Sequence, residues 1–326
     1  MRIGIYSPNW IGDSVLAIPF VQLLKKQEQG VEIIIVCKDW VSGVFENHPD
    51  VDEIISFSNF QLEGILNLIE TGNSLKKFKF EKFYTLTDSF RSGFILWLSC
   101  AKRRYGYRSQ MRSIFLTDVK SMPNKVTHRS KKYLNLLGKN NGISTRPKIH
   151  LTNVETSWAK IEMDKLNLIK PIALFPFSVA SNRNLPFVVL KKWIKNSKSN
   201  YLIFGSKNDT AKGKRLIKDC DGNRIKSICG KYSLRESMAL IKMCDYAVAS
   251  DSGLGHLAAV IGLPTISFFG VGIDTITSPI GDKSKIIKHC NPCLGSLCKD
   301  LGNDRVCIKK ISSFDIEVAV DELSNQ

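Results

Sequence analysis

The sequence predicts an α/β protein made of two doubly wound domains. Three observations support this fold class: short apolar runs alternate with amphipathic segments, the alternation occurs twice, and 326 residues are enough for two hydrophobic cores. Such alternation is typical of a parallel sheet with helices on both faces. We expect the two domains to face a central cleft at the carboxyl ends of their strands, where ligands bind in open α/β sheets.

The first half of the chain supplies strand-like runs and two amphipathic segments with apolar residues three and four positions apart. The predicted strands are 3–6, 32–37, 53–56 and 83–86, and the predicted helices are 14–26 and 60–69.

After residue 150 the alternation starts again, which predicts a second domain. Its strands are expected at 172–175, 201–204, 225–228, 246–250 and 265–269, and its helices at 186–195, 210–219, 233–243 and 252–261. The segment 153–168 is the natural linker region, and 313–323 is a terminal helix. We therefore expect domains at 1–155 and 156–311, followed by a C-terminal helix at 312–326.

The formal net charge of +17 is concentrated in one segment, 101–150. That segment holds thirteen Lys and Arg residues against a single acid, Asp118. A local charge of this size favours an anionic partner, which could be a nucleic acid, a membrane surface or a phosphorylated acceptor; the alternative is a solvated basic face. No apolar run is long enough to span a bilayer, and 1–6 is a strand without the character of a signal peptide, so we expect a cytoplasmic protein.

Four cysteines near the C-terminus form a cluster of their own: Cys290, Cys293, Cys298 and Cys307. The first pair has the C-x2-C spacing that permits zinc, but the later spacings do not make the usual second half of a zinc site. The cluster is a local staple or a zinc site, and the sequence leaves both open.

The most informative motif is the stretch 250–256, Ser-Asp-Ser-Gly-Leu-Gly-His, which lies between a predicted strand and a predicted helix. Such a turn leaves unpaired backbone N–H groups at the helix N-terminus, and these attract phosphate. Gly253 and Gly255 would let a ligand approach the backbone closely. Alternatives are that Asp251 or Ser252 caps the helix, and that His256 packs inside the core.

The same stretch also fits the dinucleotide pattern G-x-G-x-x-A, with Asp274 about 20 residues further on, which would indicate a NAD enzyme. That pattern normally opens a domain at its first strand, whereas here several strand–helix units precede it. A nucleotide diphosphate is therefore the favoured ligand.

Polar loops follow other predicted strands of the second half. Ser178, Ser181 and Arg183 could hold a diphosphate by charge-assisted hydrogen bonds, and Asp209 could bond a ribose or cap its own helix. The loops at 176–186, 205–209, 229–233 and 250–256 should converge at one edge of the sheet.

In the first half, Asp13 stands at the start of the first predicted helix. The helix end favours the ionised carboxylate, which a general base for an acceptor hydroxyl requires; the alternative is a helix cap.

Four motifs together resemble glycosyltransferase family 9, the ADP-heptose:lipopolysaccharide heptosyltransferases, and most of all the heptosyltransferase II branch. They are Asn-Trp-Ile-Gly-Asp at 9–13, Gly-Lys-Tyr-Ser-Leu-Arg-Glu at 230–236, Asp-Ser-Gly-Leu-Gly-His-Leu-Ala-Ala at 251–259, and the strand at 264–270. The resemblance implies a GT-B fold with two Rossmann-like domains, inverting chemistry, and neither a metal nor another cofactor.

The resemblance also implies roles for individual residues. Asp13 would deprotonate the acceptor, Ser178 and Arg183 would hold the diphosphate, and Asp209 would bind the ribose. The donor sugar and phosphates would contact Asp251, Ser252, Gly253, Gly255 and His256, while the acceptor side would include Asp88, Arg91 and His128. Phe177 stands where the family usually has glycine, and Arg183 where it usually has lysine.

The partners implied are an ADP-heptose donor, a lipopolysaccharide core acceptor and, through residues 101–150, the anionic cytoplasmic face of the inner membrane. The segment 112–116 could dip into that interface or pack in the core. Other nucleotide sugars remain an alternative donor class. Nucleic acid is not expected, because residues 120–150 lack interleaved aromatics and the chain has no known nucleic-acid module.

Overall fold

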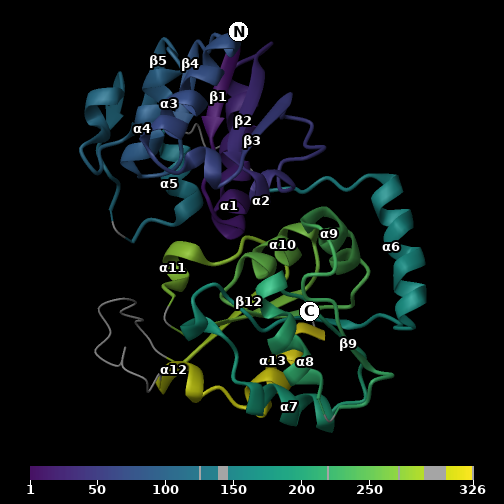
Figure 1. The fold of residues 1–326 in the computed structure, drawn as a ribbon. Coiled ribbons are helices and arrows are strands. Elements are labelled where there is room, and N and C mark those ends of the chain that lie inside the picture. Colours follow the sequence, from purple (N-terminus) through teal and green to yellow (C-terminus); the bar gives the residue numbers. More distant parts are fainter. Residues whose placement is uncertain (125, 139–145, 219, 271, 290–305, 325–326) are drawn as a thin grey trace. The chain divides into compact units, whose positions relative to one another are not determined.

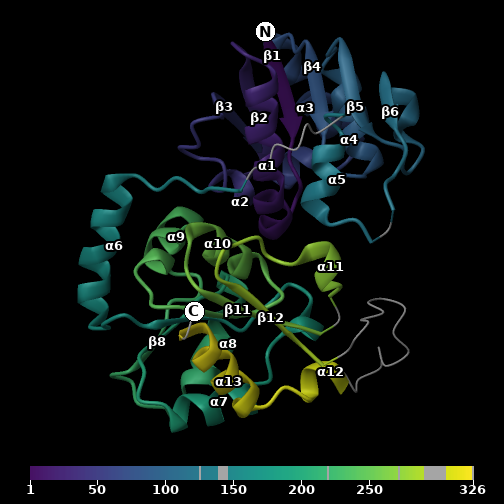
Figure 2. The same cartoon turned by 180° about the vertical axis from the view of Figure 1, so that it is seen from behind.

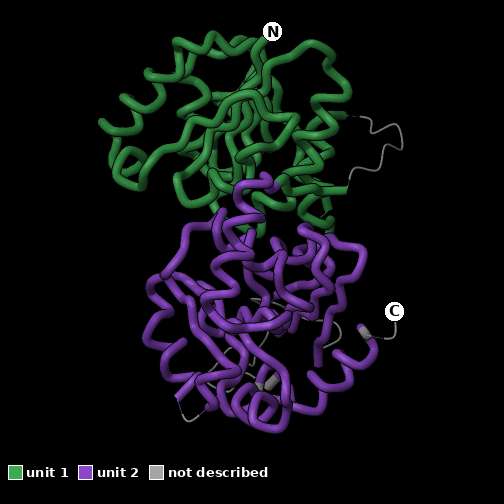
Figure 3. Tube along the Cα trace, turned by 90° about the vertical axis from the view of Figure 1, so that its right-hand side faces the viewer, with its two compact units in different colours: residues 1–150 green, residues 151–326 purple. Residues whose placement is uncertain are grey.

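A computed structural model describes residues 1–124, 126–138, 146–218, 220–270, 272–289 and 306–324. The chain forms two compact units, residues 1–150 and 151–326 (Figure 3). Within the described residues, no helix combines the length and the apolar character needed to cross a membrane.

The first unit is built on a parallel sheet in the order β3-β2-β1-β4-β5-β6. After β1 the chain adds β2 and β3 on one side of that strand, and then adds β4, β5 and β6 on its other side. The strand order therefore reverses between β1 and β4. The strands are β1 (Arg2–Tyr6), β2 (Glu32–Lys38), β3 (Glu53–Phe57), β4 (Lys82–Thr85), β5 (Arg103–Tyr107) and β6 (Asp118–Lys120).

Helices cover this sheet because its central strands are apolar on both faces, as in β2, whose five inner residues are all buried. Helix α1 is buried nearly throughout and packs against α5, while α3 packs against α4. The helices are α1 (Ile11–Gln27), α2 (Asp39–Ser42), α3 (Ile65–Ser74), α4 (Phe90–Leu98) and α5 (Arg129–Asn135), with 3₁₀ turns η1 (Phe60–Leu62), η2 (Leu75–Phe78) and η3 (Arg112–Phe115).

The second unit repeats the same winding, with a parallel sheet in the order β12-β11-β10-β7-β8-β9. Here the order reverses between β7 and β10. The strands are β7 (Ile172–Phe175), β8 (Tyr201–Ile203), β9 (Ile225–Ser227), β10 (Ala247–Ser250), β11 (Thr265–Phe269) and β12 (Ser284–Lys288).

Alternate residues of β7 enter two separate cores, one on each face of this sheet. Ile172 and Leu174 join the core beneath α7 and α13, whereas Ala173 and Phe175 join the core beneath α6, α9 and α10 (Figures 1 and 2). The helices are α6 (Asn153–Leu166), α7 (Phe187–Asn196), α8 (Thr210–Ile217), α9 (Leu234–Lys242), α10 (Gly253–Ile261), α11 (Asp274–Thr277), α12 (Val306–Lys309) and α13 (Ser313–Ser324), with 3₁₀ turns η4 (Ser181–Arg183) and η5 (Lys207–Asp209).

The predicted α/β fold of two doubly wound sheets is confirmed, and the predicted strands match within about two residues. Two details differ. The helix expected at 60–69 is split, because Gly64 has a positive φ of 76° and separates η1 from α3. The linker segment is helix α6, which belongs to the second unit and packs against α9.

Candidate functional site

Asp13 and Asp88 both lie beside the point where the first sheet reverses its strand order. Asp13 stands in the first turn of α1, just after β1, and Asp88 follows β4, the strand that pairs with β1. A crevice at the carboxyl ends of strands forms at such a reversal, and ligands of open α/β sheets bind there. The fold therefore places both predicted residues where a ligand site is expected.

Asp13 faces the start of α5. The Nε atom of Arg129 lies 3.6 Å from Asp13 Oδ1, and both side chains are partly buried. Fully buried Tyr133 lies nearby, and burial together with the charge of Asp13 raises the pKa of its hydroxyl well above the usual value. A guanidinium and a neutral phenol thus flank the Asp13 carboxylate.

Asp88 connects the same helix to the core of the unit. Its carboxylate pairs with Lys132 of α5 and lies 3.5 Å from the guanidinium of Arg112. Arg112 is completely buried, and Nε donates to the carbonyl of Tyr107 at 2.8 Å. Its Nη1 also donates to the carbonyl of Thr87. Asp88 is therefore held by two cations and acts as part of a rigid network.

The other two predicted acceptor-side residues, His128 and Arg91, lie in different parts of the first unit. His128 is the N-cap of α5, where its ring accepts a hydrogen bond from the backbone N–H of Ser130. Arg91 lines a cavity of about 300 Å³ at the carboxyl ends of β1, β2 and β4, together with Asn9 and Lys38. Burial, and then the charge of Arg91, lower the pKa of Lys38. In the described part of the chain, no ion pair joins Arg91 to Asp88.

The second unit brings the predicted donor residues to its own reversal point, between β7 and β10. Ser250, the last residue of β10, donates to the carbonyls of Phe175 and Phe177 at 3.1 and 3.2 Å and so holds the two strand ends together. Arg183, in η4 after β7, places Nη1 3.1 Å from Oδ2 of the buried Asp251, just after β10. This ion pair spans the reversal point.

Helix α10 begins at this pair without a side-chain cap. Ser252 is the N-cap residue, yet its hydroxyl makes no capping hydrogen bond and is buried without a partner within the described residues. The predicted alternative of a Ser252 cap is therefore wrong. The uncapped N-terminus, with half-exposed Gly253 in its first turn, keeps backbone N–H groups available for an anion.

Gly255 and His256 face the protein interior. A Cβ atom on Gly255 would lie 3.0 Å from the Cβ of Ala249, so this glycine allows close packing of α10 on β10. Packing thus accounts for a glycine at this position, and contact of Gly255 with a ligand stays a prediction. His256 is buried in the same turn.

The neighbouring loops supply Asp209, Ser178 and Phe177. Burial raises the pKa of Asp209, but hydrogen bonds from Ser206 and Lys212 outweigh burial, and the net pKa is lowered. The bonds from Ser206 close a capping box at η5, whereas Asp209 gives no side-chain cap to α8, the helix that it was expected to cap in the alternative interpretation. The N–H of Ser178 donates to Asn184 Oδ1 at 2.7 Å. Phe177 is buried in the core, so its ring does not replace glycine at a phosphate-facing surface.

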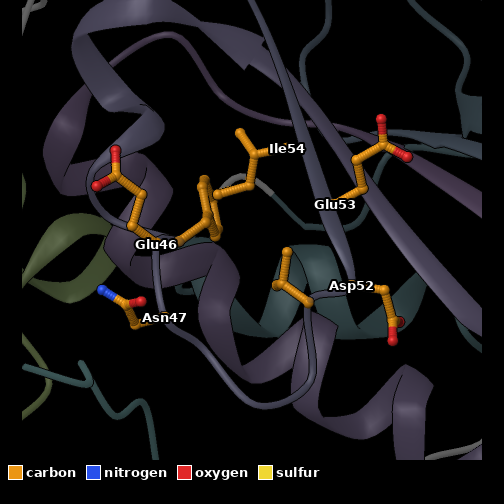
Figure 4. A pocket seen from close by; sticks show the side chains of 7 residues that line it. Glu46, Asn47, Asp52, Glu53 and Ile54 are labelled. Carbon is orange, nitrogen blue, oxygen red and sulfur yellow. The ribbon is translucent and has the colours of Figure 1, made fainter. Parts of the chain in front are cut away.

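A second cavity of about 270 Å³ is lined by Glu46, Asn47, Asp52 and Glu53 (Figure 4). It lies at the amino end of the edge strand β3, whereas Asp13 and Asp88 lie beyond the carboxyl ends of the central strands β1 and β4. Asp52 already accepts from Lys25 and from the N–H of Ile33, both at 2.7 Å. Its position and its acidic lining set it apart from an anionic-ligand site.

Among the residues that the structure describes, no group of three or more His, Cys, Asp or Glu side chains could hold a metal ion. Cys290, Cys293 and Cys298 of the cysteine cluster lie outside those residues, and only Cys307 falls within them. The chemistry of the cluster stays a prediction.

Sequence reasoning missed the cations that hold the first site, namely Arg112, Arg129 and Lys132. All three belong to the basic segment 101–150, for which the sequence favoured an anionic partner, with a solvated basic face as the alternative. In the structure these three side chains form ion pairs with aspartates of the same unit. Arg103 also pairs with Asp118 at 2.5 Å. The available signal was the position of Arg129 and Lys132 in one helix directly after His128.

Comparisons with known proteins agree with this geometry. The family model described as glycosyltransferase family 9 (heptosyltransferase) matches residues 69–302. Lipopolysaccharide heptosyltransferase 2 of Salmonella typhimurium is 22% identical over 312 residues, covering 88% of each protein. The structure of the ADP-heptose lipopolysaccharide heptosyltransferase II of Escherichia coli is similar, with a TM-score of 0.84 at 19% identity, covering 99% of this chain and 98% of that chain.

An E. coli heptosyltransferase solved with ADP is also similar, with a TM-score of 0.74 at 14% identity, covering 99% of this chain and all of that one. These likenesses confirm the predicted GT-B fold class.

Proposed function

The chain belongs to glycosyltransferase family 9, the heptosyltransferase family, and on this premise we propose that it transfers heptose from ADP-heptose to the inner core of lipopolysaccharide. Support for the acceptor class comes from the relatives, which are named lipopolysaccharide or lipooligosaccharide heptosyltransferases. Support for ADP comes from a structural relative solved with that nucleotide.

The observation that carries the proposed donor site is the ion pair between Arg183 and buried Asp251 beside the uncapped start of α10. A diphosphate would take hydrogen bonds from the Arg183 guanidinium and from the first N–H groups of α10. Ser178 and Ser252 would add hydroxyl donors. Asp209 would accept from the ribose beside the bonds that it already accepts from Ser206.

In the proposed reaction Asp13 is the general base. Its carboxylate takes the proton from an acceptor hydroxyl while that oxygen forms a bond to the anomeric carbon of the heptose. The bond from that carbon to the diphosphate breaks on the opposite face, the electron pair leaves with ADP, and the configuration is inverted. Arg129, 3.6 Å away, supports this role because a nearby cation favours the ionised carboxylate that a base needs.

The lipopolysaccharide acceptor is anchored in a bilayer, so the proposed location is the cytoplasmic face of the inner membrane. Asp88, Arg91 and His128 would shape the acceptor side, and the exposed basic residues of 101–150 would attract anionic lipid. A nucleic-acid partner is not part of this proposal.

Two measurements test the proposal. Titration calorimetry in magnesium-free buffer should find binding of ADP in preference to UDP, GDP and NAD. A preference for UDP or GDP would agree with the proposed donor site but exclude ADP-heptose as the donor. Binding of NAD alone would exclude sugar transfer.

The second measurement is release of ADP from ADP-heptose in the presence of lipopolysaccharide inner core. Asp13→Asn should lower kcat by about 10²–10⁴-fold without weakening ADP binding. The matched control is Asp39→Asn, another aspartate in the first turn of a helix of the same unit. Equal rates for Asp13→Asn and the control would exclude Asp13 as the base.

A further inference from the structure

The first unit carries a cluster of large apolar side chains at its surface, formed by one face of α4 and by the segment that contains η3. We name it the α4–η3 patch. Four of its members are strongly exposed, with exposed fractions of 42% for Phe90, 48% for Trp97, 85% for Met111 and 75% for Ile114. Single exposed apolar residues are common on soluble proteins, but a contiguous group indicates an interaction surface.

Ring contacts make the patch contiguous. Phe90, Phe94 and Trp97 lie four and three residues apart and so share one face of α4. Phe115 contacts all three, with ring centroids 5.1, 5.3 and 5.9 Å apart. Ile114 adjoins Phe115 in η3. These four rings form one aromatic layer, of which Phe90 and Trp97 are the most exposed members, and Met111 and Ile114 adjoin it along the chain.

The backbone holds these side chains at the surface. Gln110 and Met111 both have positive φ values, 44° and 57°, which are unfavourable for residues other than glycine. The Gln110 side chain accepts a hydrogen bond from the N–H of Phe90 at 3.1 Å, which fixes the turn to the start of α4. Buried Arg112 anchors η3 from below. Met111 and Ile114 are therefore presented by a rigid support.

The charge around the patch favours one kind of partner. Neither 90–98 nor 108–116 contains an acidic residue. Arg91 and Arg108 are exposed beside the patch, and their side chains make no hydrogen bond or ion pair within the described residues. Aromatic and aliphatic side chains flanked by arginine suit the interface of an anionic bilayer, where apolar groups enter the acyl boundary and cations meet the headgroups.

We propose that the α4–η3 patch docks the protein onto an anionic lipid bilayer. This deepens the proposed function, on which it rests for the identity of a membrane-anchored acceptor. In this proposal apolar residues make the main contact with the bilayer, because several cations of the segment 101–150 form ion pairs within the first unit.

The test is co-sedimentation of the full chain with vesicles of phosphatidylethanolamine and phosphatidylglycerol, and with vesicles of phosphatidylcholine alone. The wild type should bind the anionic vesicles more tightly. The double variant Trp97→Ser/Ile114→Ser should bind them at least about tenfold more weakly, because it removes two apolar groups from the interface. The matched control Ile161→Ser/Val188→Ser removes two exposed apolar groups from the second unit and should bind as the wild type does.

Depth is measured with brominated acyl chains, which should quench tryptophan fluorescence in the wild type and much less in Trp97→Phe. Absence of vesicle binding, or an equal loss in the control pair, would overturn the proposal. So would a change from dimer to monomer in the Trp97→Ser/Ile114→Ser variant without loss of vesicle binding, since the patch would then bind a second copy.

ADP release with a deacylated, water-soluble core acceptor should be unchanged in that variant. This readout separates a failure of docking from a failure of the proposed function.

Discussion

Glu155 of α6 and Arg235 of α9 form the ion pair that ties the first helix of the second unit to the rest of that unit. Arg235 donates twice to the carboxylate, with both N···O distances 2.7 Å, and its side chain is only 9% exposed. Glu155 also accepts from the backbone N–H of Thr152 and completes a capping box at the start of α6. The substitution Glu155→Gln keeps the capping box, which glutamine also forms, but removes the charge and one of the two oxygens that accept from Arg235.

The size of the effect follows from the pKa of Glu155. The hydrogen bond from Arg235 is the largest influence and lowers this pKa from its ordinary value of 4.5 to about 2. That difference corresponds to about 3 kcal/mol in favour of the ionised form in the folded state. Because the side chain is still 21% exposed, solvent screens part of the interaction, and we expect Glu155→Gln to cost about 2 kcal/mol.

The assay is urea unfolding at several pH values, followed by circular dichroism and tryptophan fluorescence. A depressed folded-state pKa stabilises the protein above the unfolded-state value, so the difference between wild type and Glu155→Gln should be full at pH 6 and shrink from about pH 5 towards pH 2. Glu236→Gln is the matched control, because Glu236 completes a similar capping box on Ser233. Equal losses in the two variants, or a difference that does not change with pH, would refute the reasoning.

Three further predictions concern the two sites. Arg183→Ala should weaken ADP binding by about 10–100-fold in calorimetry, because charge-assisted hydrogen bonds are lost; unchanged affinity would remove Arg183 from the donor site. Gly272→Ala should also weaken ADP binding, because the new Cβ would lie 2.1 Å from Asp251 Oδ2 and displace that carboxylate; binding equal to wild type would show that the carboxylate position is unimportant. Arg112→Met should destabilise the first unit by about 3–5 kcal/mol in urea unfolding, because Asp88 loses an ion-pair partner and the carbonyls of Tyr107 and Thr87 lose their donor; a loss below about 1 kcal/mol would contradict a structural role.

The sequence predicted the central strands of both sheets because their residues are apolar on both faces, as in β2 and β7. It did not predict β5, β6 and β12, which lie towards the sheet edges. The sequence of β5 is Arg-Arg-Tyr-Gly-Tyr, and only its last two residues are buried. In β12 two isoleucines stand between lysines, and no residue is fully buried. Both strands lack the continuous apolar run on which the prediction depends, whereas the edge strands β3 and β9 were predicted.

The site residues also divide into some that the sequence predicted and others that it did not. Asp13 and Asp251 were predictable because each lies where the chain passes from a strand into the start of a helix. Their cationic neighbours were not, because Arg129 and Asp13 are more than 100 positions apart and only the packing of α5 on α1 brings them together. Arg112 illustrates the limit most clearly. The sequence left open whether 112–116 enters an interface or packs in the core, and the structure divides the segment: Arg112 is completely buried, whereas Ile114 is exposed.

The two units have the same strand order, and each has its own reversal point with its own polar residues. One consequence concerns how such a protein diversifies. In the proposed function the loops after β7 and β10 recognise the nucleotide and those after β1 and β4 the acceptor, so substitutions in one set leave the hydrogen-bonded ladder beneath the other set undisturbed. On that proposal two specificities drift separately under selection, and a lineage acquires a new acceptor while it retains its inherited nucleotide.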